Sequence, residues 1–103
     1  MRPYHITPSA EQDVIDITSY TLEKWGEKQA LHYAGLLEKH FYEIGCMNAV
    51  VRSFSKLYPE IMVSRCEHHY IFFTHQNDQK PQIFAVLHEH MDFVTWLEKR
   101  LKL

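Results

Sequence analysis

The chain has 103 residues, which is enough for one compact domain and too few for two. Hydrophobic residues make up 46% of it, and only 3 Gly and 4 Pro occur, so the composition excludes a disordered or loop-rich protein. With a formal net charge of −2, the protein is not strongly basic, as a nucleic-acid binder usually is. No apolar run reaches transmembrane length. A phosphate-binding face would have to come from residues 46–103, which carry seven basic residues, six acidic residues and five of the eight His.

The amino-terminal segment has no apolar core of the kind found in signal peptides. Cys46 and Cys66 are too few for a disulfide framework and are not spaced as a CxxC motif, so we expect reduced thiols. Cys66 is expected to be a small core residue. We predict a cytoplasmic protein with no membrane segment.

The first 45 residues predict a short strand followed by two helices. Tyr4–Ile6 forms the strand, Thr7 is suited to cap the first helix, and Gly26 is suited to end it. An apolar stripe of Ala10, Val14, Ile17, Tyr20 or Thr21, and Trp25 marks the buried face of this helix. The second helix runs from about Glu27 to Gly45, with a buried stripe of Ala30, Tyr33, Ala34, Leu37, Phe41 and Ile44 that Leu31 and Leu36 widen. The short connection predicts an antiparallel helical hairpin.

The remaining residues predict strands and a final helix. Residues Val50–Phe54 fit either a short strand or an irregular connection, and the alternation in Ile61–Cys66 fits a strand. Tyr70–Thr74 and Gln82–His88 flank a polar turn and predict a β-hairpin, after which Met91–Leu101 shows helical spacing. Helices followed by strands indicate an α+β fold. We predict one domain, residues 1–103, in which the helical hairpin packs on one face of an antiparallel sheet of about four strands.

The order of these motifs resembles that of the ParE branch of the RelE/ParE toxin superfamily. The first part of the resemblance is Ile6-Thr7, Ala10, Asp13, Asp16-Ile17, Tyr20, Trp25-Gly26, Gln29-Ala30 and Tyr33. The second is Arg65, Tyr70, Phe72-Phe73, Ile83, Val86-Leu87-His88 and Met91-Asp92. Together they span residues 4–92. The chain departs from the family pattern in residues 46–60 and again after Phe93.

This resemblance implies a toxin of a bacterial type II toxin–antitoxin module, a class that inhibits growth and stabilises plasmids. It implies a cognate antitoxin as partner. ParE-like members poison DNA gyrase, whereas RelE-like members cut mRNA on the ribosome, so the site must decide the activity. We expect gyrase to be the target, with no cofactor, no metal, no small-molecule substrate and no catalytic residues. The alternatives are a ribosome-dependent mRNA endonuclease and an inactive toxin-fold protein that acts in antitoxin binding or autoregulation.

The endonuclease alternative would use Arg65 for the phosphate, with His88 and His90 as the acid or base. The more ordinary interpretation of Arg65 is an ion pair with an acidic residue. His88 and His90 face the same way on a strand and suggest a metal site, but no third ligand follows from the spacing, so a hydrogen-bonded or capping His is expected. His68 and His69 fall in a predicted turn, and we expect them to be solvated.

The last predicted helix offers an interaction surface. Its aromatic residues either dock on the core or bind a partner, and the two interpretations overlap. The predicted target- or antitoxin-binding residues are Arg65, His88, His90, Asp92, Phe93, Trp96 and Arg100. The segment from Phe93 to Leu103 is the first place to look for target binding.

Overall fold

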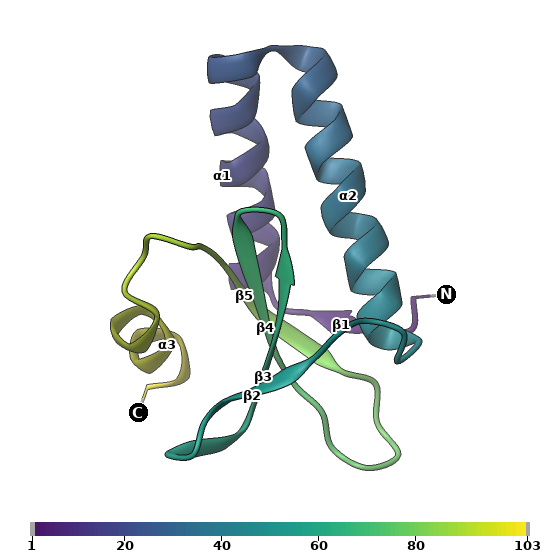
Figure 1. Ribbon diagram of the computed structural model, residues 1–103, viewed down its shortest axis with the longest axis vertical. Coiled ribbons are helices and arrows are strands. Elements are labelled where there is room, and N and C mark those ends of the chain that lie inside the picture. The colour runs from purple at the N-terminus through teal and green to yellow at the C-terminus, as the bar shows by residue number, and fades with distance from the viewer. Residues whose placement is uncertain (1, 103) are drawn as a thin grey trace.

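The elements follow the predicted order, with one additional strand. The computed structural model describes residues 2–102. Its elements are β1 His5–Ile6, α1 Pro8–Trp25, α2 Glu27–Gly45, β2 Arg52–Ser55, β3 Tyr58–Cys66, β4 His69–Thr74, β5 Gln82–His88 and α3 Phe93–Leu101. The five strands form one sheet in the order β1-β5-β4-β3-β2, and α1 and α2 stand together on one side of it (Figure 1). The predicted α+β fold is therefore confirmed.

The helical hairpin begins and turns at the predicted residues. The Thr7 side chain caps α1 by accepting a hydrogen bond from the Ala10 N–H at 3.2 Å. Gly26, at φ 92°, is the single residue between the two helices, and its N–H donates to the Leu22 carbonyl at 3.0 Å. This φ lies in the region that glycine adopts without steric penalty, so one residue suffices to reverse the chain. None of the helices in residues 2–102 is long and apolar enough to span a membrane.

The sheet differs from the prediction in three ways. The segment Val50–Phe54, left open between strand and loop, overlaps β2. β2 is an edge strand that brings the sheet to five strands rather than about four. β3 begins at Tyr58, three residues earlier than predicted. β1 pairs with β5 in parallel, whereas the other strand pairs are antiparallel. The first strand was predicted, but its parallel partner lies far away in the sequence. The polar edge strand β2 has too little periodicity to be assigned from sequence alone.

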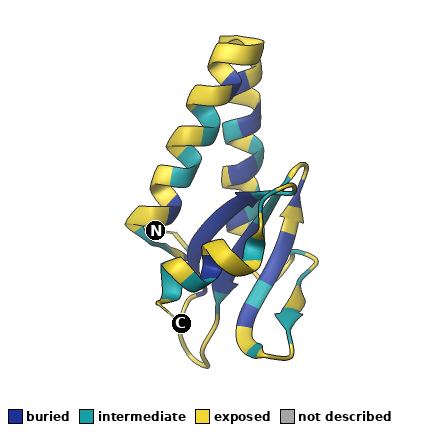
Figure 2. Ribbon diagram, turned by 90° about the vertical axis from the view of Figure 1, so that its left-hand side faces the viewer, coloured by how far each residue is buried: buried dark blue, intermediate teal, exposed yellow. Residues whose placement is uncertain are grey.

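Both faces of the sheet are covered, each by different helices. The hairpin packs on one face through a core that includes Leu37, Ile71 and Ile83, each fully buried. The opposite face carries a second core that includes Phe72 and Leu87, and α3 closes it with Leu97. In Figure 2 the buried residues concentrate in the strands, while the upper part of the hairpin is mostly exposed. The last predicted helix therefore docks on the domain.

The apolar stripe of α1 extends beyond the part of the helix that the domain covers. Ala10 is fully buried and Thr21 is 9% exposed, but Tyr20 is 61% and Trp25 72% exposed. Leu31 of α2, predicted to widen the buried stripe, is also exposed at 65%. Of the two alternatives Tyr20 and Thr21, the structure buries Thr21. The prediction of Trp25 and Leu31 as core was wrong because the hairpin projects past the end of the sheet (Figure 1). A helix of 18 residues is about 27 Å long, and its distal turns have no strand beneath them.

Candidate functional site

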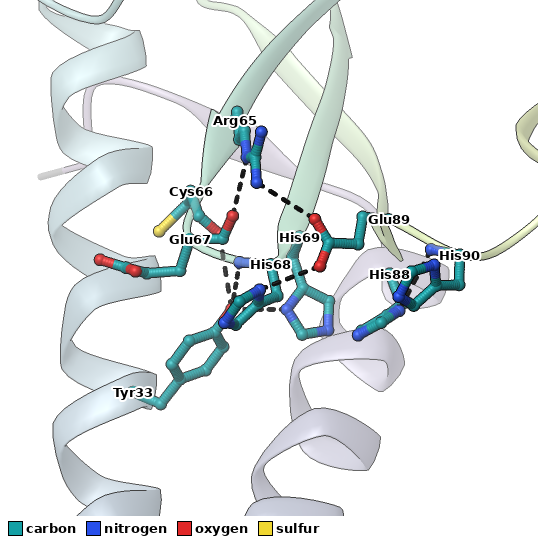
Figure 3. Close-up of polar contacts among 9 residues, drawn as sticks. All are labelled: Tyr33, Arg65, Cys66, Glu67, His68, His69, His88, Glu89 and His90. Atoms are coloured by element: carbon teal, nitrogen blue, oxygen red, sulfur yellow. Dashed lines mark hydrogen bonds and ion pairs between the residues drawn. The ribbon is translucent and has the colours of Figure 1, made fainter.

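A cluster of polar residues lies where β3, β4 and β5 end near the helical hairpin. Cys66 pairs with His69 across a two-residue turn, in which Glu67 adopts φ 54°. The register of β4 with β5 then places His69 directly opposite His88. The β3–β4 turn and the end of β5 therefore bring together residues that are far apart in the sequence (Figure 3).

Glu89 is the central carboxylate of this cluster. It accepts a hydrogen bond from Arg65 Nη2 at 3.1 Å and lies 2.9 Å from His68 Nδ1. Arg65 also donates from Nε to the Glu67 carbonyl at 2.9 Å. The hydrogen bond from His68, together with the nearby positive charges, lowers the pKa of Glu89. An ionised Glu89 therefore offsets the charge of Arg65, which is the ion-pair interpretation of this arginine.

His69 is joined to the helical hairpin through Tyr33. The Tyr33 hydroxyl lies 2.6 Å from His69 Nδ1 and accepts a 3.4 Å hydrogen bond from the His68 N–H. Burial, with smaller effects from His88 and His68, lowers the pKa of His69 to about 4. Burial also raises the pKa of Tyr33 to about 12. At neutral pH this contact therefore joins an uncharged imidazole to a protonated phenol. The expectation that His69 would be solvated was wrong, because β4 begins at this residue and turns its ring toward α2.

His88 and His90 continue the row of imidazole rings. The ring centroids of His69 and His88 are 5.2 Å apart, and those of His88 and His90 are 5.1 Å apart. His88 Nδ1 accepts the backbone N–H of His90 at 3.2 Å, which is a hydrogen-bonded role at a strand end. Among residues 2–102, no three His, Cys, Asp or Glu side chains are grouped so as to hold a metal ion.

A groove of about 870 Å³ separates this cluster from the distal half of the hairpin. Its lining residues are Asp16, Ile17, Tyr20, Thr21, Trp25, Gln29, Tyr33, His68, His69 and His88. The α1 wall is largely apolar because it contains the uncovered end of the stripe, whereas the strand ends contribute imidazoles. Such a combination is suited to a partner segment that presents apolar side chains together with hydrogen-bonding groups.

The predicted residues of the last helix have different environments. Asp92 caps α3 by accepting hydrogen bonds from Thr95 N at 3.3 Å and Thr95 Oγ1 at 2.8 Å, and these bonds lower its pKa. Phe93 is half-buried, with its ring centroid 5.2 Å from those of Tyr70 and Phe72. Arg100 is bound to Asp13 of α1.

Trp96 is the member of the predicted set on α3 that presents a large apolar surface to solvent. It is 39% exposed, and Lys99 Nζ lies 5.3 Å from its ring centroid. Val94, two residues earlier on the helix, is 47% exposed. The structure thus places Arg65, His88 and His90 in the cluster and Trp96 on the exposed side of α3. Asp92, Phe93 and Arg100 contact other parts of the domain. Sequence reasoning missed Tyr33, His69 and the groove, for which the only signal was a stripe longer than a small sheet covers.

Comparisons with known proteins agree with this fold. The family model for the ParE toxin of type II toxin–antitoxin system, parDE, matches residues 4–93. A toxin ParE of Escherichia coli is 35% identical over 102 residues, covering 99% of each chain. A chain of a chromosomal ParDE toxin–antitoxin system from P. aeruginosa shares the fold with a TM-score of 0.71 at 16% identity, covering 85% of this chain and 96% of that one. This chain therefore belongs to the ParE family of toxins of type II toxin–antitoxin systems.

Proposed function

We propose that this toxin inhibits growth by binding DNA gyrase and interfering with its cycle of DNA cleavage and religation, and that a cognate antitoxin neutralises it. The exposed side of α3, which carries Val94, Trp96 and Lys99 and is called here the α3 face, contacts gyrase. An exposed tryptophan such as Trp96 is typical of an interface anchor. This exposed tryptophan, in a member of the ParE family, is the observation that carries the proposal.

The charge distribution supports protein binding over cleavage of RNA. The net charge is −2, and Arg65, the cation nearest the imidazoles, is engaged by Glu89 at 3.1 Å. RNA cleavage needs a cation free to stabilise a phosphate in the transition state. Glu89 would repel a phosphate at this position, since its lowered pKa keeps it ionised at neutral pH.

The groove is the proposed seat of the antitoxin. Tyr20 and Trp25 expose large apolar surfaces along α1, and the groove continues to the imidazoles at the strand ends. An antitoxin segment with apolar side chains on one face would bury these rings, and its polar groups would reach His68 and His88. The groove and the α3 face are different surfaces, so neutralisation and target binding can be separated by mutation.

The test uses purified toxin, DNA gyrase and supercoiled plasmid. We expect cleaved plasmid to accumulate with wild-type protein, and we expect an equimolar amount of antitoxin to prevent it. A Trp96→Ala variant should leave much less cleaved DNA while still binding antitoxin. If wild-type toxin leaves gyrase activity and plasmid unchanged, the proposal is wrong.

The ribosome-dependent endonuclease remains the second candidate because Arg65, His88 and His90 do lie in one cluster. Primer extension on translated mRNA would then reveal cuts at the ribosomal A site. Arg65→Ala should abolish such cuts. Cuts that depend on Arg65 would support this candidate over gyrase poisoning.

A further inference from the structure

Within residues 2–102, no strand pairs with the outer edge of β5 over most of its length. β1 pairs only with Gln82 and Ile83 of β5. Beyond them the register with β4 shifts, because Ile83 pairs with Phe73 while Ala85 pairs with Phe72, and Phe84 is left over. The unpaired N–H and C=O groups of such an edge would ordinarily attract another strand.

Side chains occupy the place of the missing strand. Arg100 Nη1 donates to the Phe84 carbonyl at 3.0 Å, and Asp13 Oδ2 accepts the Val86 N–H at 2.9 Å. Further along, the His88 N–H lies 3.4 Å from Met91 Sδ. Two of these three capping groups, Arg100 and Met91, come from the segment that contains α3. Docking of α3 therefore also caps the edge of β5.

Asp13 and Arg100 form a bidentate ion pair that links α3 to α1. Nη1 of Arg100 lies 2.8 Å from Oδ2 of Asp13, and Nη2 lies 2.6 Å from Oδ1. The two side chains are only 12% and 18% exposed, and the hydrogen bonds raise the pKa of Arg100. A bidentate pair holds a planar geometry that one point contact does not. It therefore fixes the orientation of α3 as well as its distance from α1.

The other contacts of α3 provide less restraint. The helix has nine residues, and an isolated helix shorter than about 12 residues is marginal in water. Leu97 is its one buried residue, while Phe93 and Leu101 are half-buried. Hydrophobic burial is non-directional, so these contacts favour docking of the helix but define its orientation less sharply than a bidentate pair does.

We infer that Asp13 and Arg100 are positioning residues for the α3 face. They hold α3 in the one orientation that turns Val94, Trp96 and Lys99 outward, and neither side chain contacts the target itself. Arg100, predicted from sequence as a contact residue, thus acts through Trp96. This inference rests on the proposed function, since it assigns the pair a role in presenting the surface that binds gyrase.

Two substitutions break the pair in different ways. Asp13→Asn removes the charge but leaves an oxygen that can accept the Val86 N–H, so this backbone group keeps its partner. Arg100→Lys keeps the charge but cannot span both carboxylate oxygens and the Phe84 carbonyl. The matched control is Glu11→Gln, which removes one exposed carboxylate from the same helix, two residues away.

Amide hydrogen exchange and gyrase-dependent plasmid cleavage are measured on each variant. We expect the amides of α3 to exchange roughly tenfold to a hundredfold faster in both pair variants, while the amides of β4 keep their protection. Cleaved plasmid should fall about tenfold or more, antitoxin affinity should stay unchanged, and Glu11→Gln should match wild type.

Three results would overturn the inference, and they differ from one another. Unchanged exchange in α3, or equally faster exchange in α3 and β4, would mean that the pair does not position α3. Full plasmid cleavage by Asp13→Asn with a loosened α3 would remove the role in target binding and leave the proposed function intact. No cleavage by wild type and Glu11→Gln would overturn the proposed function and the positioning role together.

Discussion

Tyr33 and His69 join the helical hairpin to the end of the sheet, with the phenol oxygen 2.6 Å from Nδ1 of the imidazole. The two rings also meet edge to face, with centroids 5.4 Å apart. Both residues line the groove between α1 and the strand ends. This contact therefore links the stability of the domain to the shape of the surface proposed to bind the antitoxin.

Removing the phenol hydroxyl tests this link. Tyr33→Phe keeps the ring but leaves His69 Nδ1 and the His68 N–H without their partner. The free energy of unfolding should fall by about 1–2 kcal/mol, the range for a hydrogen bond whose partner is left unsatisfied. Urea denaturation measures this loss, and Tyr42→Phe, on an exposed ring of the same helix, is the control. Equal stability of Tyr33→Phe and wild type would contradict a structural role for the contact.

Stability should decline with acid before most carboxylates titrate. The pKa of His69 is lowered by burial from its ordinary value of 6.5 to about 4. Between these pH values the unfolded chain binds a proton that the folded chain does not, so stability is full above about 6.5 and falls as the pH drops toward 4. His40, whose pKa burial also lowers, acts in the same direction.

Acidification should lower the free energy of unfolding by about 2 kcal/mol through His69 alone, allowing for partial solvent screening. This loss is measured as the free energy of unfolding at pH 7 and pH 4.5. His69→Gln should reduce the difference between the two values, whereas His75→Gln, an exposed residue of the β4–β5 turn, should not. The same pH dependence in wild type and His69→Gln would show that His69 stays accessible to protons.

Substitution of an exposed residue that lines the groove should change the affinity for the antitoxin but not the stability of the toxin. Trp25→Ala should weaken antitoxin binding by about 2 kcal/mol, or roughly thirtyfold in Kd, as expected for an aromatic anchor. Because Trp25 is 72% exposed, the free energy of unfolding should change little. The control is Leu31→Ala, which removes a side chain exposed to a similar degree, 65%, that does not line the groove. Equal losses of affinity in both variants would place the antitoxin elsewhere.

Docking of α3 can be tested through its buried leucine. Leu97 is 2% exposed and packs in the core on the face of the sheet opposite the hairpin. Leu97→Ala should lower the free energy of unfolding by about 2–4 kcal/mol, as for other buried leucines. Val94→Ala, on the exposed side of the same helix, should have a small effect. A small loss for Leu97→Ala as well would mean that α3 is not docked in solution.

Some parts of this structure were predictable because their signals are local. Thr7 and Gly26 mark the two ends of α1 as its capping residues, and capping depends on only a few neighbouring residues. The β4–β5 hairpin followed from aromatic and β-branched residues on either side of a polar turn. Helical spacing of apolar residues predicted the last helix within Met91–Leu101, which contains α3.

Other parts depend on which distant segments meet. The apolar stripe of α1 gave no indication of where the sheet ends, so Trp25 was predicted as core and the choice between Tyr20 and Thr21 stayed open. The His69–His88 pairing and the contact with Tyr33 follow from strand register and helix packing, neither of which a turn-like His68-His69 pair reveals. The Asp13–Arg100 pair joins residues 87 positions apart, and no periodicity in the sequence connects them.

The central claim is that this toxin poisons gyrase through the α3 face. Its most direct measurement is the yield of cleaved plasmid when gyrase and supercoiled DNA are incubated with wild-type toxin, with Trp96→Ala or with Glu11→Gln. We expect cleaved DNA with wild type and Glu11→Gln, and about a tenfold lower yield with Trp96→Ala, since loss of an aromatic anchor commonly costs more than 1 kcal/mol. Intact, fully supercoiled plasmid in the presence of wild-type toxin, or cleavage by Trp96→Ala equal to that by wild type, would contradict this claim.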